Sequence, residues 1–278
     1  MRKSISTFYT FLSPRKLKAG YDCFMTSSYD SIARDYHWLV PDELLSGDSF
    51  VERHQDLLGS LPRHALILDC ACGISLDAIA LARRGYRVCG SDASSTLVAE
   101  ARKRARAAGL RIPFLKCSWE ELPRRFGRER FDLVLCTGNS ISHCPDRSAM
   151  VRSLVAIREV LKDGATLVLD SRNWEKLRDE RPRLTAIDQV VEREGKRCVP
   201  IYLWDFPARW EEPHTVEIVL LFLEESGGVN HKLYQLQYWP FRLKEILDRL
   251  KEAGFGSIQT NYSNEADRYE ALAQRTSE

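Results

Sequence analysis

The chain has 278 residues, of which 44% are hydrophobic and 29% charged, and its net charge is +2. This length and composition suit one large α/β domain, or a domain with a sizeable insertion. The small net charge gives no general argument for binding to nucleic acid or to a membrane surface. The sequence contains no run of about eighteen apolar residues, and its N-terminus lacks the apolar region of a secretory signal, so neither a membrane span nor export is expected.

The eight cysteines do not form a disulfide or metal-binding pattern. Five of them (Cys70, Cys72, Cys89, Cys117 and Cys136) lie in or just after apolar runs, where cysteine behaves as a small hydrophobic residue. There is no Cys-x-x-Cys pair, and the histidines lack the spacing of a zinc site. These observations predict a reducing compartment, a cytoplasmic location and no bound metal.

The N-terminal half predicts an alternation of strands and helices after an irregular start. Residues 1–20 are basic and weakly patterned, which indicates an N-terminal arm, and we assign residues 1–28 to it. In the segment that follows, Tyr29, Ile32, Ala33 and Tyr36 share one helical face, and a further helix is expected over about 49–58. We then expect strands over 65–70, 86–91, 112–117, 131–136 and 165–170, and helices over 76–84, 95–108 and 147–161. This rhythm is typical of a parallel sheet with helices on both faces, and it assigns residues 29–175 to one core domain.

After Asp170 the pattern changes to antiparallel hairpins. Glu194-Gly195 joins the runs 184–194 and 196–206, and Ser226-Gly227-Gly228 joins the runs 214–224 and 229–239. We therefore predict an antiparallel β insertion over 176–240. Residues 241–278 then return to the core as one helix and two last strands, at 255–262 and 268–273. The predicted fold is a Rossmann-like α/β sheet, mostly parallel with its last strand antiparallel.

Two acids at strand ends indicate a nucleoside site. Asp69 ends the first buried strand and Asp92 ends the second, and a carboxylate at the second position can accept hydrogen bonds from both ribose hydroxyls. A dinucleotide site would need Gly-x-Gly-x-x-Gly in the first turn, where this chain has Ala71, Gly73 and Ser75. An acid just before the turn disfavours a pyrophosphate and suits a cationic ligand, such as a sulfonium with an amino-acid tail.

At this point the sequence resembles the class I S-adenosylmethionine-dependent methyltransferases, and more closely the glycine N-methyltransferase and glycine/sarcosine methyltransferase group. The resemblance covers roughly 29–275. The segments that carry it are Asp69–Asp77, Ser91–Ser94, Ser118–Trp119, Cys136–His143, Asp170–Trp174 and Tyr238–Pro240. The first turn marks only the superfamily, whereas Thr137-Gly138-Asn139-Ser140 with His143, and Ser171-Arg172-Asn173-Trp174, are specific to the group.

The resemblance implies S-adenosylmethionine as the cofactor and a role for each matching residue. The backbone from Ala71 to Gly73 would approach the methionine portion, Asp92 would bind the ribose, and Thr137 would hold the methionine amino group through its carbonyl. Tyr29 and Trp38 would cap the cofactor. The whole implied cofactor set is Tyr29, Trp38, Asp69, Ala71, Gly73, Asp92, Ala93, Ser118, Trp119, Thr137, Gly138 and His143, with Ala93, Ser118 and Trp119 beside the adenine.

On the acceptor side, the resemblance implies Asn139, His143 and Arg172, with Arg172 binding a carboxylate. The chemistry agrees, because a small amino acid offers few handles besides its carboxylate and a guanidinium matches that group with two parallel hydrogen bonds. Tyr202 and Tyr238 lie on the inserted strands, where a cavity-facing and a buried-core role are both open. The predicted activity is methyl transfer to the amine of a small carboxylate-bearing substrate, glycine-like or sarcosine-like.

Several alternatives remain at this stage. They are methyl transfer to another small molecule, cofactor binding without turnover, and a nicotinamide-dependent dehydrogenase. The basic run Arg102–Arg106 could serve a nucleic-acid methyltransferase, but with Glu100 nearby a solvated helix face is expected, and no nucleic-acid partner is predicted. In the resembled family the N-terminal arm can enter a neighbouring subunit's site, so a homo-oligomer is possible.

The sequence departs from the family pattern at two places. Ile74 and Ser75 stand where the family usually has Thr and Gly, and Ser75 would cost about 1 kcal/mol if its position requires a positive φ. Such a change would affect cofactor affinity. Cys144 follows His143 where an apolar residue such as Leu is usual, and we expect it to alter the loop beside the acceptor.

Overall fold

The structure is a computed structural model that describes residues 29–187 and 189–276, so the arm expected over 1–28 lies outside the described residues. Its larger sheet has seven strands in the order β11-β12-β5-β4-β1-β2-β3. These strands are β1 (Leu66–Asp69), β2 (Arg87–Asp92), β3 (Phe114–Lys116), β4 (Phe131–Cys136), β5 (Leu161–Arg172), β11 (Phe255–Thr260) and β12 (Arg268–Arg275). The first five pair in parallel, and β12 runs antiparallel to both neighbours, which confirms the predicted fold class.

Helices cover both faces of this sheet because its central strands are apolar on both sides. On β1, Ile67 packs in one cluster with Phe50 and Leu81, whereas Leu68 packs in another with Leu154. The helices are α2 (Asp48–Arg53), α3 (Gln55–Gly59), α4 (Leu76–Arg83), α5 (Ser95–Ala107), α6 (Leu122–Phe126), α7 (Arg147–Val160), α8 (Trp174–Glu180) and α9 (Leu243–Glu252), with 3-10 turns η2 (Tyr36–Leu39), η3 (Asp42–Leu44), η4 (Trp119–Glu121) and η5 (Ser140–His143). None of the described helices is long and apolar enough to cross a membrane.

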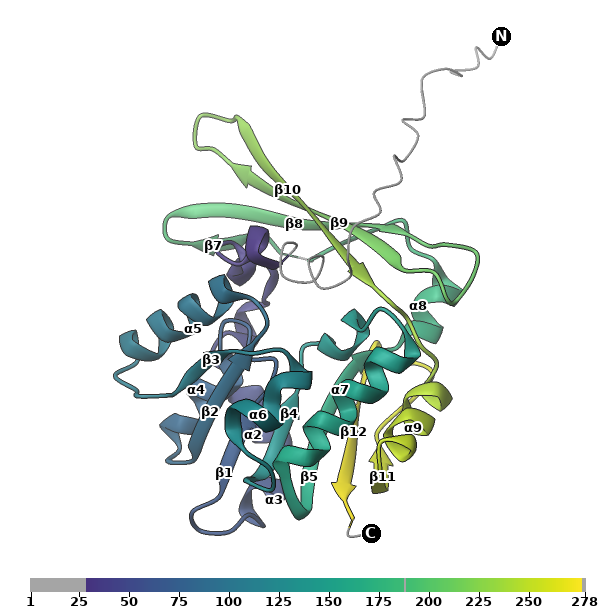
Figure 1. Cartoon of the computed structure of the whole chain (residues 1–278). Helices are drawn as coiled ribbons and strands as arrows, with labels where there is room; N and C mark the ends of the chain where they lie inside the picture. The colour runs from purple at the N-terminus through teal and green to yellow at the C-terminus, as the bar shows by residue number, and fades with distance from the viewer. Residues whose placement is uncertain (1–28, 188, 277–278) are drawn as a thin grey trace.

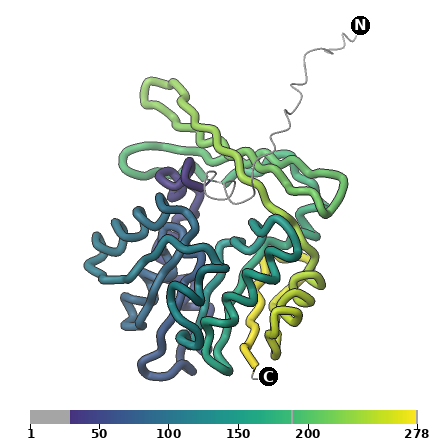
Figure 2. The backbone as a smooth tube through the Cα atoms, in the orientation of Figure 1, coloured from purple at the N-terminus to yellow at the C-terminus, as the bar shows by residue number. Residues whose placement is uncertain are grey.

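The second sheet is antiparallel and is inserted between β5 and α9. It consists of β6 (Leu184–Ala186), β7 (Val191–Arg193), β8 (Lys196–Asp205), β9 (His214–Leu223) and β10 (Val229–Tyr238). Alternate residues of β9 are buried, which gives this sheet one face that packs toward the core. Figures 1 and 2 show it lying across one end of the larger sheet, the end at which the parallel strands finish.

A lid segment (residues 29–44) lies between the two sheets. Its Asp30 carboxylate accepts a hydrogen bond from Ser94 at the start of α5. Lys232 of β10 donates to both oxygens of Asp35, at 2.9 and 2.7 Å. Arg193 of β7 donates to Asp42 at 2.5 Å, so the segment is tied to the larger sheet's helices and to the second sheet.

Three predicted elements differ from the structure. The helix expected over 49–58 is broken at His54 into α2 and α3, because the His54 ring bonds the Phe50 carbonyl (2.9 Å) and approaches Glu270 of β12 (3.3 Å). The third strand is only three residues long, because it begins after Pro113, which has no N–H to donate. The run 184–194 forms two short strands instead of one, and both pair with β8.

Candidate active site

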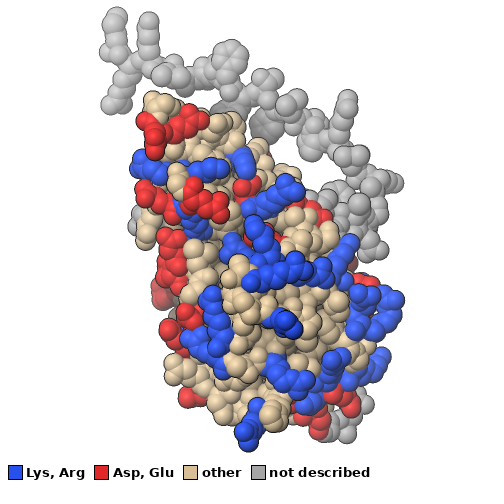
Figure 3. All heavy atoms as spheres, turned by 90° about the vertical axis from the view of Figure 1, so that its left-hand side faces the viewer, with Lys and Arg blue, Asp and Glu red and all other residues tan. Residues whose placement is uncertain are grey.

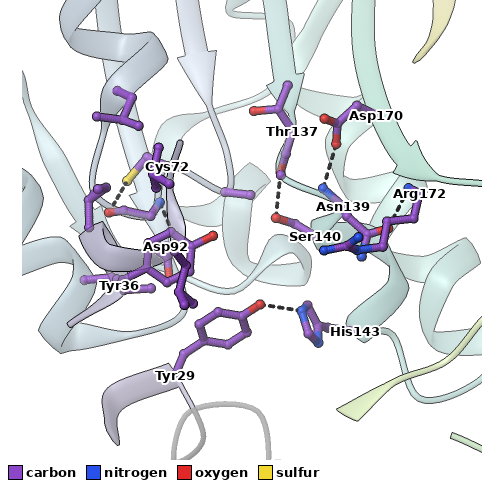
Figure 4. Close-up of a pocket in the computed structure, with 18 of the residues that line it drawn as sticks. Tyr29, Tyr36, Cys72, Asp92, Thr137, Asn139, Ser140, His143, Asp170 and Arg172 are labelled. Carbon is purple, nitrogen blue, oxygen red and sulfur yellow. Dashed lines mark hydrogen bonds between the residues drawn. The ribbon is translucent and has the colours of Figure 1, made fainter. Parts of the chain in front are cut away.

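A cavity of about 980 Å³ lies between the ends of the parallel strands, the lid segment and the second sheet. Figure 4 shows part of its lining. Every site residue predicted from the sequence lines this cavity except Trp38. These residues are Tyr29, Asp69, Ala71, Gly73, Asp92, Ala93, Ser118, Trp119, Thr137, Gly138, Asn139, His143, Arg172, Tyr202 and Tyr238. The cavity therefore brings together side chains that are up to about two hundred positions apart.

The turn after β1 presents bare backbone to the cavity. Gly73 has a φ of +49°, and a Cβ added there would meet no protein atom within 4 Å. The N–H of Gly73 donates to Asp92 Oδ2 at 2.9 Å, which fixes the turn against the end of β2. Ser75 has a φ of +69°. This positive φ is the backbone conformation in which we expect serine to be strained.

Asp92 retains hydrogen-bonding capacity at the end of β2. Its two carboxylate oxygens accept one backbone N–H each, from Gly73 and from Ser94, both at 2.9 Å. Each oxygen of an ionised carboxylate has a second acceptor site, which leaves room for two hydroxyl donors. Burial raises the pKa of Asp92, and these two N–H donors oppose that rise. The arrangement fits a ribose at this position.

Three carboxyl groups crowd the end of the cavity near the first turn: Asp69, Asp77 and Asp92. Burial raises the pKa of Asp69 well above its ordinary value, and the charge of Asp77 adds to the effect. Burial likewise raises the pKa of Asp77 to about 6, although a hydrogen bond from Thr137 Oγ1 (3.1 Å) counteracts it. Negative groups held so close together suit a ligand that carries positive charges, such as a sulfonium with an ammonium group. The residues present therefore fit S-adenosylmethionine.

The residues expected beside the adenine are held by their own hydrogen bonds. Trp119 Nε1 donates to the Cys70 carbonyl at 2.9 Å, which fixes the indole against the end of β1. The Ser118 hydroxyl and N–H both donate to Glu121 Oε2 at 3.0 Å. The carbonyl of Thr137 accepts from the Ser140 hydroxyl at 2.7 Å, so one of its lone pairs is occupied.

Tyr29 and His143 form a hydrogen-bonded pair across the cavity (Figure 4). His143 Nδ1 lies 2.8 Å from the carbonyl of Gln237, an acceptor, so Nδ1 carries the proton. Nε2 then accepts from the Tyr29 hydroxyl at 2.7 Å. Burial lowers the pKa of His143 to about 4, so the ring is neutral near pH 7. With its free lone pair already used, His143 positions Tyr29.

Arg172 extends from the end of β5 into the cavity. Its guanidinium carbon lies 5.3 Å from the Trp204 ring centroid on the second sheet, a cation–π contact. No carboxylate in the described part of the chain forms an ion pair with Arg172. Tyr202 and Tyr238, whose roles the sequence left open, both line the cavity, and the Tyr238 ring packs 4.6 Å from that of His143.

The structure corrects the expectation for Trp38 and specifies the surroundings of Asn139 and Cys144. Trp38 does not cap the cavity: it is 3% exposed and packs edge-on against Phe222 of the second sheet, while Tyr36 and Leu39 of the same 3-10 turn face the cavity instead. Asn139 lines the cavity, but it is buried and its side chain bonds Ser142 and the backbone of Arg172. Cys144 is buried in the core beside Ser153 of α7 and is not among the residues that line the cavity.

Ile74 packs in a small buried cluster with Ala33 of the lid segment and Leu97 of α5. Its apolar side chain helps to hold that segment against the first turn. Several residues that line the cavity were not assigned from the sequence, and among them are Tyr36, Asp77, Asp170 and Arg268. Asp77 is the last residue of the motif Asp69–Asp77 and Asp170 is the first of the motif Asp170–Trp174, so their places in these motifs could have identified them. The position of Arg268 depends on how β12 pairs with β5.

The basic run lies on α5, and none of its residues lines the large cavity. Glu100 pairs with Lys103 and Arg104, and Arg102 donates to the Phe114 carbonyl at 2.6 Å. Figure 3, which views the α5 side, shows many basic side chains with acidic ones around them. The seven described cysteines are free and buried, and the described His, Cys, Asp and Glu residues form no group that could hold a metal ion.

Comparisons with known proteins agree with this geometry. Residues 67–164 match the family model described as "Methyltransferase domain". A glycine/sarcosine N-methyltransferase of Parasynechococcus marenigrum (strain WH8102) is 32% identical over 224 residues, which cover 75% of this chain and 71% of that protein. A glycine/sarcosine N-methyltransferase of Aphanothece halophytica is 27% identical over 194 residues, with coverage of 70% and 67%. The crystal structure of an S-adenosylmethionine-dependent methyltransferase from Clostridium acetobutylicum ATCC 824 superposes with a TM-score of 0.68 at 17% identity, covering 90% of this chain and 96% of that one.

The chain is thus an enzyme of the class I S-adenosylmethionine-dependent methyltransferases, and S-adenosylmethionine is its cofactor. Within that class it belongs to the family that contains the glycine/sarcosine N-methyltransferases.

Proposed function

We propose that this methyltransferase acts on the amine of a small substrate that carries a carboxylate, of the glycine or sarcosine kind. The proposal rests mainly on Arg172. Its guanidinium lines the cavity and has no carboxylate partner among the described residues. A planar guanidinium binds a carboxylate through two parallel hydrogen bonds. The relatives reported above, which are named for glycine and sarcosine, support the same acceptor class.

The two ends of the cavity have opposite charge, which suits two different ligands. Asp69, Asp77 and Asp92 line the end near the first turn. Arg172 and Arg268 line the end near β5 and β12, where the acids Asp170 and Glu270 are paired with Arg268 and Arg53 and leave Arg172 uncompensated. We assign the acidic end to the cofactor, which supplies an electrophilic methyl group on a sulfonium. We assign the basic end to the carboxylate of the acceptor.

The basic end also favours the reactive form of an amine. Methyl transfer needs a neutral nitrogen with a free electron pair, and nearby positive charges lower the pKa of a substrate ammonium group. Burial raises the pKa of Tyr29 well above its ordinary value and that of Tyr202 to about 12, so both phenols stay protonated near pH 7. The residues here hold and orient the amine, and the proton that the nitrogen loses goes to water.

Alignment is the main contribution that such a site can make. The reaction is an in-line displacement with a neutral leaving group, and good alignment of the reacting atoms can supply about 7–11 kcal/mol of the barrier. Arg172 would set the acceptor's direction by gripping its carboxylate, and the tyrosines from the lid segment and the second sheet would enclose the amine.

The experiment measures transfer of labelled methyl to glycine and sarcosine, compared with ethanolamine and glycinamide, which lack the carboxylate. Arg172→Gln removes the charge, and the loss of two charge-assisted hydrogen bonds should raise the KM for glycine about a hundredfold or more. The variant Arg172→Lys keeps the charge without the planar fork, and we expect an intermediate KM. An unchanged KM in Arg172→Gln, or equal rates on glycinamide and glycine in the parent enzyme, would contradict the proposal.

A further inference from the structure

Arg268 of β12 lies directly opposite Arg172 of β5 in the antiparallel register. Residues paired in this way project from the same face of the sheet, with their Cβ atoms about 4.5–5.5 Å apart. Both arginines line the cavity. Like charges at directly opposed positions destabilise a sheet, so this pair is unfavourable unless negative groups compensate it.

Within the described residues, the compensation is incomplete. Asp170, two residues before Arg172, accepts from Arg268 Nη2 at 2.8 Å through its Oδ2 atom. Its other oxygen accepts the N–H of Asn139 at 2.6 Å. Glu270, the other acid on this face, is paired with Arg53 and His54. Asp170 therefore neutralises Arg268 alone, and Arg172 beside it has no carboxylate partner among the described residues, so the cavity wall here carries excess positive charge.

The two arginines have different surroundings. Arg172 packs over the Trp204 ring and acts electrostatically on Tyr202, both on the second sheet. Arg268 acts on Tyr36 of the lid segment and on Tyr238. The Arg268 side chain is 43% exposed, and among the described residues only its Nη2 atom has a carboxylate partner. No hydrogen bond to the described part of the chain occupies its remaining donors, so they can bind an anion at a position separate from the one that Arg172 offers.

We propose that Arg268 is a specificity-determining residue, which together with Arg172 selects an acceptor amine that carries two acidic groups. One acidic group is the carboxylate held by Arg172, so the inference rests on the proposed function. The second is a carboxylate or a phosphate bound by Arg268. An acceptor as small as glycine leaves the second guanidinium without a ligand anion.

The test compares kcat/KM for glycine and sarcosine with kcat/KM for aspartate, glutamate and O-phosphoserine, all with labelled methyl transfer on the full chain. Aspartate and glutamate report a second carboxylate, and O-phosphoserine reports a phosphate. Three variants accompany the parent enzyme: Arg268→Gln, whose amide can still donate to Asp170; Arg268→Lys; and Arg172→Gln. Thermal unfolding of each variant verifies that it is folded.

We expect at least one two-acid amine to exceed glycine by about tenfold or more, the factor for one charge-assisted hydrogen bond. In Arg268→Gln this ratio should fall by the same factor, mainly through KM, and Arg268→Lys should restore part of it. If the parent enzyme prefers glycine or sarcosine over every two-acid amine, or if Arg268→Gln lowers both classes equally, the role of Arg268 is wrong while the proposed function stands. If Arg172→Gln changes neither class, or if no carboxylate-bearing amine is methylated, the proposed function itself fails.

Discussion

The side-chain oxygen of Asn139 accepts a hydrogen bond from the backbone N–H of Arg172 at 3.0 Å. This contact ties the loop after β4 to the end of β5. Asn139 also donates through Nδ2 to Ser142 Oγ at 2.9 Å, and its own N–H donates to Asp170. Its φ of +62° is in the left-handed region, which asparagine tolerates better than most residues. Asn139 is therefore a positioning residue for Arg172.

Two substitutions of Asn139 distinguish the contribution of its side chain from that of its left-handed backbone conformation. Asn139→Ala leaves buried polar groups without partners and should lower the free energy of unfolding by about 2–3 kcal/mol. It should also lower kcat/KM for the acceptor about tenfold or more, because the backbone of Arg172 loses its anchor. Asn139→Gly suits the positive φ and should recover about 1 kcal/mol of stability, but not the activity. Full activity in Asn139→Gly would contradict the anchoring role.

Asp92 should control affinity for the cofactor. Asp92→Asn replaces one acceptor oxygen with an NH2 group, which is a donor. This group faces a backbone N–H and cannot accept a hydrogen bond from a ribose hydroxyl. We expect the Kd for S-adenosylmethionine, measured by calorimetry, to rise about ten- to a hundredfold. The matched control is Asp132→Asn. Asp132 also accepts a backbone N–H, from Leu66, but lies outside the cavity lining, so its variant should lose stability with the Kd unchanged. Equal effects on Kd in both variants would argue against the assignment.

His143 should make stability depend on pH. Its folded-state pKa of about 4 lies below the ordinary value of 6.5, so the unfolded chain binds more protons between these values. Its contribution is therefore full above about pH 6.5 and is lost as the pH falls toward about 4, amounting to about 2 kcal/mol between pH 8 and pH 5. The raised pKa of Asp77 acts in the opposite direction, so the measurement must be a difference between proteins.

The variant His143→Gln provides that difference, because glutamine can still donate to the Gln237 carbonyl and accept from Tyr29. The free energy of unfolding of each protein is measured with denaturant at pH 5 and at pH 8. The change in this free energy between the two pH values should differ by about 2 kcal/mol between the variant and the parent. The parent should lose more stability on acidification than the variant does. Identical pH dependence in the two proteins would mean that His143 is not held neutral by the fold.

The lid segment should respond to its ion pair with the second sheet. The Asp35 side chain is 14% exposed and binds both Lys232 and Tyr234, so its bonds are better protected than those of a surface pair. Asp35→Asn should raise the KM for S-adenosylmethionine about three- to tenfold, because Tyr29 and Tyr36 depend on this segment for their position. The control is Asp248→Asn, which breaks the exposed 2.6 Å pair with Lys244 on α9, and neither residue of that pair lines the cavity. A KM that rises equally in both variants would reject the role of the segment.

Ser75 should be a site at which glycine stabilises the protein. Its positive φ is unfavourable for serine, and its buried hydroxyl has no partner among the described residues. Ser75→Gly removes the backbone strain and the unpaired hydroxyl. Glycine loses more backbone entropy on folding than serine does, but this cost is smaller. We therefore expect the free energy of unfolding to rise by about 1 kcal/mol and the Tm by about 2–4 °C. Ser75→Ala removes only the hydroxyl and should gain less. A lower Tm in Ser75→Gly would show that the serine is not strained.

The amino-acid sequence by itself determined that the chain forms a mostly parallel sheet and in what succession strands and helices follow one another along the chain. It also determined the hairpins that follow β5 and the end of the sheet at which the site lies. These features come from local patterns. The apolar run Phe131–Cys136 predicts a strand buried on both faces, and Asp69 and Asp92 mark where parallel strands end at a common edge. The motifs around Thr137 and Arg172 placed further residues at the same edge, and these residues do line one cavity.

Only the tertiary structure decided how particular side chains are used. Trp38 faces the second sheet because a 3-10 turn, with about three residues per turn, puts Tyr36 and Leu39 together on the cavity side. The pairing of Arg268 with Arg172 depends on the register of two strands that are about a hundred residues apart, and no local pattern specifies that register. The same holds for Asn139, whose hydrogen bonds to β5 exist only after the sheet has formed.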